Sequence, residues 1–238
     1  MTAGLRHPWL VLWDIDHTLL ETRGLGSELY GRAFKTATGT EMKQQADVTG
    51  QTEPSIFNAT LRLHGIPEEK HYLTRYKEAL AEEYEQHQDA LRSRGRALPG
   101  AQDTLATLAA EPTLIPSVLS GNLRAVSIIK LNVFNLDKYL DLEIGAYGDD
   151  DPERPKLVAI AQERAHLKYG SPFSTANTVV VGDSTHDINT GREGGARSIG
   201  IASGSDDTDT LREAGADAVL PDLTDVRAVL AALRGLLT

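Results

Sequence analysis

The apolar positions of the chain occur first as one continuous run, Trp9–Trp13, which ends at the polar segment of residues 14–18. An uninterrupted apolar run of this length is typical of a strand that is buried on both faces of a parallel sheet. Further segments rich in apolar residues follow in the second half of the chain. They predict extended segments over residues 114–119, 142–146, 178–181, 198–202 and 218–220.

The segment from residue 21 to residue 96 has a different pattern, because it lacks β-branched runs and its apolar residues recur every three or four positions. This spacing predicts a helix around Leu29–Ala37 that stops at Gly39, and a second helix over Glu53–Gly65. The apolar stripe of Leu73–Leu91 predicts one long amphipathic helix. With fewer than three heptads, the stripe indicates the packing face of a small helical domain rather than a coiled coil.

After the segment Leu98–Gly100, helices and strands alternate. Helices are predicted over residues 101–110, 123–131, 157–167, 208–214 and 226–237. Strands that alternate with helices of this length predict right-handed crossovers and an α/β fold with a doubly wound parallel sheet, as in Rossmann-like proteins. The helical segment interrupts this fold after its first strand. We therefore expect a core of residues 1–20 and 98–238, and an all-helical inserted domain of residues 21–97.

The composition narrows the class of protein. The 238 residues include 24 Lys and Arg against 34 Asp and Glu, and the formal charge of −10 disfavours general nucleic-acid binding. No apolar run is long enough to span a membrane, and residues 1–20 lack the features of a signal peptide. The absence of cysteine excludes disulfides and thiolate metal ligands. We expect a cytoplasmic protein, a monomer or homodimer, in which any metal is bound by oxygen atoms.

Polar residues directly follow three of the expected strands, and ligands of such sheets bind beyond the carboxyl ends of the strands. These residues are Asp14 and Asp16 after the first strand, Ser120 and Asn122 after the second, and Asp183 and Asp187 after the strand of residues 178–181. Carboxylates gathered this closely repel one another unless a cation lies among them, and an oxygen-only ligand set suits Mg²⁺. Each aspartate alone could simply cap a turn or a helix, but their joint placement favours a magnesium site.

The same residues carry a resemblance to a known family. The sequences Asp14-x-Asp16-x-Thr18 and Gly182-Asp183-Ser184-x-x-Asp187, together with Ser120 and a basic residue before a helix, are similar to the four motifs of the haloacid dehalogenase (HAD) superfamily. The resemblance covers essentially the whole chain. The helical insertion and the segment Leu98–Gly100 further resemble the phosphoglycolate phosphatase-like members, so the insertion is expected to be a C1-type cap domain.

The resemblance implies a role for each matching residue. Asp14 would be the nucleophile that attacks phosphorus, and Asp16 would protonate the leaving alcohol and then deprotonate the hydrolytic water. Ser120 would hydrogen-bond a phosphoryl oxygen, together with backbone N–H groups of the neighbouring Gly121 and Asn122. The implied ligands of Mg²⁺ are Asp14, the Asp16 carbonyl and Asp183, with Asp187 supporting them from close by.

The third motif leaves two candidates open. The superfamily usually places a lysine, often followed by proline, just before a helix, whereas this sequence reads Arg154-Pro155-Lys156. Arg154 is a cation followed directly by proline, as in the usual motif, and Lys156 supplies the usual residue type two positions later. An arginine forks onto two oxygens and a lysine is a compact point charge, so either side chain could neutralise a phosphoryl group. Both are candidate catalytic residues.

Five residues are candidates for contact with the substrate. They are Thr18, Gly121 and Asn122 in the motifs, Arg124 just after the second motif, and Gln51 in an expected cap loop. His17 occupies a variable position of the first motif and is expected to be a neighbour rather than a catalyst.

The function that the resemblance implies is a Mg²⁺-dependent phosphatase that acts on a small phosphorylated metabolite through an aspartyl-phosphate. The alternatives are a phosphomutase, which uses the same intermediate, and a non-catalytic phospho-ligand binding or receiver-type protein. Asp16 disfavours a dehalogenase, and a phosphonatase would need a cap lysine, for which Lys35 and Lys43 lack a convincing setting. Neither nucleic acid nor a membrane is expected as a partner.

Overall fold

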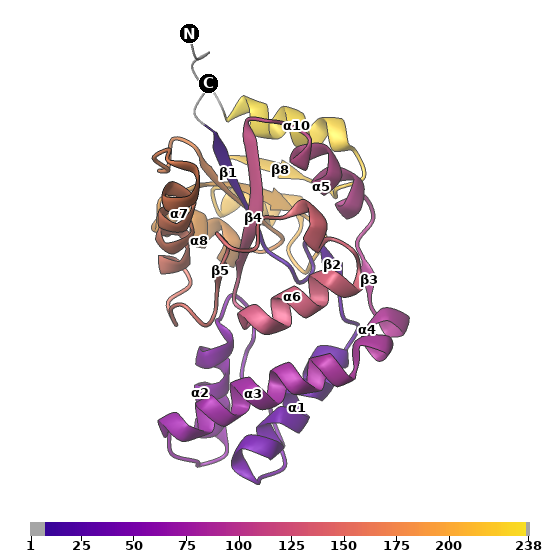
Figure 1. Cartoon of the computed structure of the whole chain (residues 1–238), viewed down its shortest axis with the longest axis vertical. Coiled ribbons are helices and arrows are strands. Elements are labelled where there is room, and N and C mark those ends of the chain that lie inside the picture. The colour runs from indigo at the N-terminus through magenta and orange to yellow at the C-terminus, as the bar shows by residue number, and fades with distance from the viewer. Residues whose placement is uncertain (1–7, 237–238) are drawn as a thin grey trace.

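The computed structural model describes residues 8–236 of the chain. The larger part is a sheet flanked by helices, and a smaller helical part lies beyond one end of that sheet (Figure 1). Residues 1–7 and 237–238 lie outside the described residues. With them lie the first part of the predicted core segment 1–20 and the last residue of the helix predicted over residues 226–237.

The sheet consists of parallel strands in the order β5-β4-β1-β6-β7-β8. The strands are β1 (Trp9–Trp13), β4 (Leu114–Ser120), β5 (Ala146–Tyr147), β6 (Thr178–Gly182), β7 (Arg197–Ile201) and β8 (Ala218–Leu220). Because β4 and β6 flank β1 on opposite sides, the direction of winding reverses beside β1. The predicted α/β fold with a doubly wound parallel sheet is confirmed, and its switch point is where a ligand is expected.

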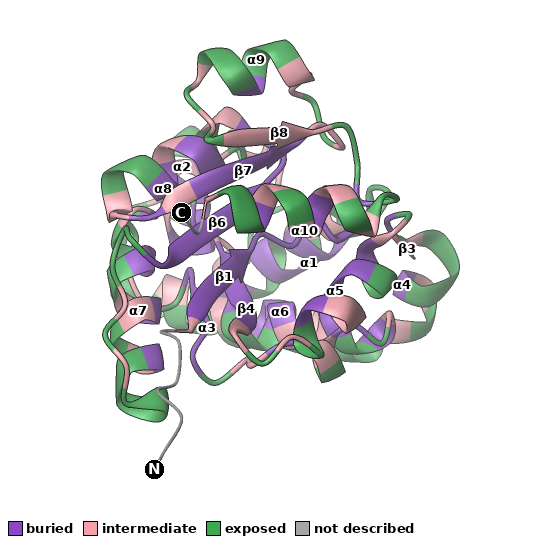
Figure 2. Cartoon of the chain, turned by 90° about the horizontal axis from the view of Figure 1, so that it is seen from above, coloured by how far each residue is buried: buried purple, intermediate pink, exposed green. Residues whose placement is uncertain are grey.

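Strand β1 is buried on both faces, as its unbroken apolar sequence predicts (Figure 2). Trp9, Val11 and Trp13 belong to one hydrophobic cluster, whereas Leu10 and Leu12 belong to a second cluster on the opposite face. Helices α5 (Ala101–Ala109) and α10 (Val226–Gly235) pack on the first cluster. Helix α7 (Lys156–Tyr169) packs on the second cluster, and α8 (Thr185–Gly194) lies beside α7. The other core helices are α6 (Arg124–Val133), a 3-10 helix (Asp137–Tyr139) and α9 (Thr208–Glu213). A ligand therefore reaches the sheet at the strand ends rather than at its covered faces.

Four helices between β1 and β4 form a lobe with its own hydrophobic cluster (Figure 1). These helices, here called the cap, are α1 (Leu25–Thr38), α2 (Glu53–Leu63), α3 (Lys70–Gln86) and α4 (Gln88–Arg94). Inside the cap, Phe57 stacks on Tyr76 with 4.1 Å between the ring centroids. The cap joins the core through an antiparallel ribbon of β2 (Leu20–Glu21) and β3 (Arg96–Ala97), which lies at the sequence positions where we expected the inserted domain to begin and end.

Two predicted elements differ from the structure. The helix predicted over Leu73–Leu91 is divided between α3 and α4, because His87 leaves the helical conformation (φ −112°, ψ 22°) and its ring Nδ1 contacts the Glu83 carbonyl at 2.7 Å. The extended segment predicted over residues 142–146 is a strand only from Ala146, since the Asp141 carboxylate accepts the Glu143 N–H and forms a turn. Within residues 8–236, no helix combines the length and apolarity that a membrane span requires.

Candidate active site

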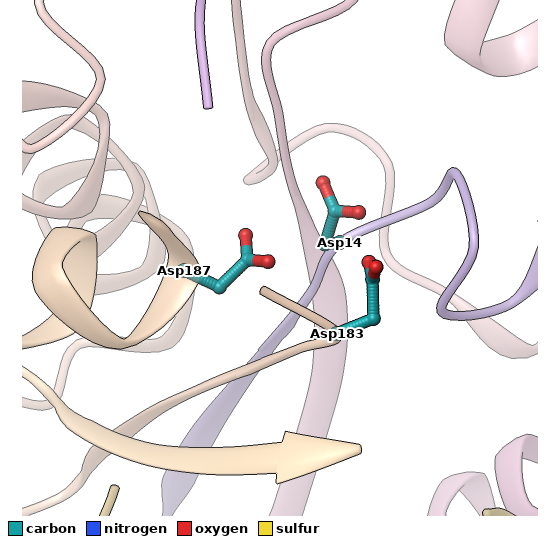
Figure 3. A group of neighbouring side chains, drawn as sticks. All are labelled: Asp14, Asp183 and Asp187. Atoms are coloured by element: carbon teal, nitrogen blue, oxygen red, sulfur yellow. The ribbon is translucent and has the colours of Figure 1, made fainter. Parts of the chain in front are cut away.

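The carboxyl ends of the three central strands converge. Asp14 follows β1, Ser120 ends β4 and Asp183 follows β6. The backbone N–H of Asp14 donates to the Val181 carbonyl at 2.9 Å, which extends the pairing of β1 with β6 up to the site. The carboxyl groups of Asp14, Asp183 and Asp187 are neighbours, and oxygen atoms of the three lie within 4.8 Å of one another (Figure 3).

Local structure fixes the positions of Asp183 and Asp187. Ser184 is the N-cap of α8 and forms a capping box with Asp187, whose Oδ2 accepts from the Ser184 N–H at 3.0 Å. The Thr18 hydroxyl donates to Asp183 Oδ1 at 3.0 Å. The loop after β7 passes so close that a Cβ on Gly204 would lie 1.8 Å from Asp183 Oδ2, so only glycine allows this approach.

Arg154 is buried between two of these carboxylates. Its Nη2 donates to Asp14 Oδ1 at 2.8 Å and to Asp187 Oδ1 at 2.6 Å, and its buried Nε has no hydrogen-bond partner among the described residues. The side chain of Lys156 is 55% exposed and pairs with Glu153 at 2.7 Å. We therefore correct the expectation that Lys156 could act at the site: α7 begins at Lys156 and turns its side chain outward, whereas Arg154 in the preceding turn points inward.

Asp16 contacts a different set of partners. Its two oxygens accept from Lys130 Nζ at 2.9 and 2.8 Å, and Oδ2 also accepts from the Asn122 side-chain amide at 2.7 Å. Lys130 Nζ donates in addition to Asn122 Oδ1 at 2.9 Å. The Asn122 amide also donates to the Ser120 hydroxyl at 2.9 Å, so one network links the ends of β1 and β4 to helix α6.

The surroundings shift the pKa values of these carboxyl groups in different directions. Burial, reinforced by the charge of Asp187, raises the pKa of Asp14 well above its ordinary value and raises the pKa of Asp183 to about 7. Burial also acts to raise the pKa of Asp16, but the charge and hydrogen bonds of Lys130 outweigh it and hold this pKa below its ordinary value. Without an added cation, burial thus disfavours the anions of Asp14 and Asp183, whereas Lys130 stabilises the anion of Asp16.

The charges at these strand ends fit a divalent cation. The charged side chains are four carboxylates, Asp14, Asp16, Asp183 and Asp187, and two cations, Arg154 and Lys130. When all four carboxylates are ionised, the excess is two negative charges, and this excess and the oxygen-only donor set suit Mg²⁺, which uses few protein ligands and bridges to phosphate oxygens. Asp14, Asp183 and Asp187 form the group that could hold the ion. The Asp16 carboxylate is outside this group because it contacts Lys130.

A cavity of about 780 Å³ adjoins these groups and is lined by both the core and the cap. The predicted substrate contacts that line it are Gln51, Gly121 and Asn122. Thr18 and Arg124 do not line the cavity, and we correct the expectation that they contact the substrate. The Thr18 hydroxyl donates its hydrogen bond to Asp183. The guanidinium of Arg124 lies over the Tyr147 ring, 5.8 Å from its centre.

Sequence reasoning missed Lys130, Glu53 and Tyr84, which also line the cavity. Lys130 Nζ lies 5.5 Å from the centre of the Tyr84 ring. Glu53 is buried at the start of α2 and accepts a hydrogen bond from the Tyr76 hydroxyl. A signal for Lys130 was present in the sequence: it stands four positions after the buried Val126, in the apolar stripe of α6, where a lysine needs an anionic partner.

The fold and the site together define a capped α/β enzyme of the doubly wound class, with acidic residues at the switch point of its sheet. The sequence model of the haloacid dehalogenase-like hydrolases matches residues 11–201. The chain belongs to this family.

Two curated relatives cover nearly the whole chain. The pyrophosphatase PpaX of Halalkalibacterium halodurans is 26% identical over 224 residues, which are 93% of this chain and 97% of the relative. A Dickeya dadantii protein named "Probable phosphatase IndB" is 27% identical over 231 residues, with 91% of each chain covered. The solved structure of a hydrolase from Pseudomonas syringae is 24% identical and has a TM-score of 0.66, over 94% of this chain and 98% of that one. At this identity the structural likeness shows the fold.

Proposed function

We propose that the chain is a Mg²⁺-dependent phosphatase that hydrolyses a small phosphorylated metabolite through an aspartyl-phosphate. The observation that carries the proposal is the contact of the buried Arg154 guanidinium with Asp14, beside the cluster of Asp183 and Asp187 and at the edge of the cavity. This arrangement combines a carboxylate nucleophile with the fixed positive charge that a transferring phosphoryl group requires. The printed names of the two curated relatives favour hydrolysis over the phosphomutase alternative.

The proposed reaction divides its work among the residues of the strand ends. A carboxylate oxygen of Asp14 attacks phosphorus, the bond to the leaving oxygen breaks, and Asp16 gives that oxygen the proton that it took from water in the preceding turnover. Asp16 then takes a proton from a water molecule that attacks the phosphorus, which releases orthophosphate and restores Asp14. Arg154 and Ser120 donate hydrogen bonds to the phosphoryl oxygens. Lys130 holds the Asp16 carboxylate toward the cavity.

The proposed ligands of Mg²⁺ are Asp14, the Asp16 carbonyl, Asp183 and Asp187. When bound, the ion supplies positive charge to the phosphoryl oxygens and to the carboxylates around it. Asp14 must be an anion to attack, but its burial and the charge of Asp187 raise its pKa. The proposal is supported by this unbalanced negative charge, which Arg154 offsets only in part.

The test is phosphate release from a panel of phosphoesters, with p-nitrophenyl phosphate as the general substrate. We expect EDTA to abolish release and added Mg²⁺ to restore it. Asp14→Asn should remove all turnover while the circular dichroism spectrum stays that of the wild type. Full turnover in EDTA contradicts the metal assignment. Isomerisation of a sugar phosphate without phosphate release indicates a phosphomutase, and binding of phosphoesters without any reaction indicates a binding protein.

A further inference from the structure

The part of the cavity that would receive the leaving group is poor in positive charge. Among the described residues that line the cavity, the lysines and arginines are Lys130 and Arg154, and both side chains are buried. His17 also lines the cavity, and it is an exposed residue. A second anionic group on a substrate would lose its hydration here, so it would need a cation or free N–H donors as partners.

Lys130 has no hydrogen-bond donor left for a substrate. An ammonium group carries three N–H donors. Lys130 Nζ has three acceptors at hydrogen-bond distance, the two oxygens of Asp16 at 2.9 and 2.8 Å and Asn122 Oδ1 at 2.9 Å. Its charge is balanced by the Asp16 carboxylate. Lys130 therefore holds residues of the site and is not a receptor for a carboxylate or phosphate of the leaving group.

Arg154 contacts the carboxylates at the strand ends. Its Nη2 donates to Asp14 and Asp187, beside the oxygen of Asp14 to which the phosphoryl group would be transferred. The positive charge of Arg154 thus serves the transferred group. A second anion, several bonds away in the leaving group, would lie beyond its reach.

The remaining wall carries carboxyl groups and neutral groups. Glu21 pairs with Arg23 at 2.8 Å and with Arg96 at 2.6 Å, and neither arginine lines the cavity. Glu53 is buried and accepts from the Tyr76 hydroxyl. The uncharged side chains between residues 21 and 97 that line the cavity are Thr22, Ser27, Tyr30, Gln45, Val48, Thr49, Gln51, Ile56, Leu80 and Tyr84. Such a wall can hydrogen-bond hydroxyl and amino groups, and among the described residues it holds no lysine or arginine besides Lys130 and Arg154 to pair with an anion.

We propose that the leaving group of the substrate is an uncharged or cationic alcohol, such as a polyol or an amino alcohol, and that esters with a second anionic group are poor substrates. The proposal rests on the proposed phosphatase function and narrows its substrate class. It separates this chain from a pyrophosphatase, because inorganic pyrophosphate carries its second anionic group directly on the leaving oxygen.

The test compares phosphoesters that differ only in this group. Glycerol 3-phosphate and 3-phosphoglycerate share a three-carbon skeleton that ends in a hydroxymethyl group or a carboxylate. We expect kcat/KM for glycerol 3-phosphate to exceed the values for 3-phosphoglycerate and pyrophosphate by at least tenfold. If neither three-carbon ester is turned over, the ratio of their inhibition constants against p-nitrophenyl phosphate decides in the same way. Equal or better use of the anionic compounds overturns the proposal, whereas no hydrolysis of any ester overturns the phosphatase function instead.

Two variants test the physical cause. Gln45→Lys adds a cation to the cap wall and should raise kcat/KM for 3-phosphoglycerate relative to glycerol 3-phosphate by about tenfold, and Gln45→Met, of similar length, should leave that ratio unchanged. Lys130→Met should lower turnover of both esters by the same factor, because Lys130 positions Asp16. A loss confined to 3-phosphoglycerate in Lys130→Met would show that Lys130 receives the second anion, which contradicts the proposal.

Discussion

Arg154 and Lys156 carry the same charge two positions apart, yet only Arg154 reaches Asp14. The charge type was visible in the sequence, but the choice between the two residues depends on the turn before α7. Pro155 is the N-cap of this helix and Lys156 its first residue, where the side chain remains in solvent. Arg154 precedes the helix and is directed at the strand ends. A pattern of residue types does not show in which direction each of these side chains points.

The first prediction separates these two cations. Arg154→Ala should lower kcat/KM by about a hundredfold or more, the usual effect of losing a charged or donor group that contacts the transition state. Arg154→Lys keeps the charge without the fork and should lose less. Lys156→Ala, which removes an exposed pair with Glu153, should change kcat/KM by less than about twofold. The measurement is steady-state hydrolysis of p-nitrophenyl phosphate, with thermal melting to verify the fold. A large loss in Lys156→Ala would transfer the role to that residue.

The place of the aspartates in the site could be predicted from the sequence, whereas the place of Lys130 could not. The reason is again the direction in which a side chain points. Asp14, Asp16 and Asp183 follow apolar strands directly, so the rule that parallel strands end at one edge of the sheet brings them together. Lys130 lies in the second half of α6, and its distance to Asp16 depends on how that helix is rotated against the cap and the core. Helix packing sets this rotation, and the sequence pattern shows only that a lysine stands in the buried stripe.

Among the elements, α2 and α3 are joined by a buried polar contact at the edge of the cavity. Glu53, the first residue of α2, accepts from the Tyr76 hydroxyl of α3. Burial is the largest influence on Glu53 and raises its pKa above the ordinary value of 4.5. The folded chain therefore keeps the Glu53 proton to a higher pH than the unfolded chain does.

The second prediction follows from this difference in proton binding. The contribution of Glu53 to the free energy of unfolding is complete below pH 4.5 and is lost as the pH rises through the raised pKa. Each unit between the two pKa values corresponds to about 1.4 kcal/mol. Glu53→Gln cannot ionise and keeps an acceptor for Tyr76, so its melting temperature should exceed that of the wild type increasingly from pH 5 to pH 8.

The control for this experiment has the opposite sign. Hydrogen bonding from Arg94 lowers the pKa of Glu28, so the contribution of Glu28 is present above pH 4.5 and lost as the pH falls. Glu28→Gln should therefore be less stable than the wild type at neutral pH, and the difference should shrink toward acid. If Glu53→Gln follows the pH dependence of Glu28→Gln, burial does not dominate at Glu53.

The accuracy of the predicted elements depends on how local their causes are. Strands β1, β4 and β6 are buried along nearly their whole length, and their predominantly apolar sequences placed them correctly. The α3–α4 boundary was missed because His87 continues the apolar spacing while its backbone leaves the helix. The contact of the His87 ring with the preceding helical turn determines where the helix ends. The spacing of apolar residues does not reveal such a contact.

At the scale of the whole molecule, the cap and the core are held together over the cavity by contacts from several segments. The backbone N–H of Glu53 donates to the Gly121 carbonyl at 2.7 Å, beside the second motif. Lys77 of α3 pairs with Asp149 of the core at 3.0 Å. The cavity is thus lined by residues of both the cap and the core. We therefore expect a change of charge at the strand ends to change the free energy of unfolding of the whole chain.

The last prediction uses this coupling to test the metal site without measuring activity. In the metal-free protein, burial raises the pKa of Asp183 to about 7, so its contribution to stability, complete below its ordinary pKa, is lost as the pH rises through about 7. Mg²⁺ that binds the folded state should raise the free energy of unfolding by about 2.7 kcal/mol at a hundred times its Kd. This corresponds to about 5–10 °C in Tm for a chain of this size. The shift in Tm should be larger at pH 8 than at pH 6. Asp183→Asn should abolish the shift, and Lys156→Ala should retain it. An equal shift in Asp183→Asn would mean that Mg²⁺ stabilises the protein at some other place.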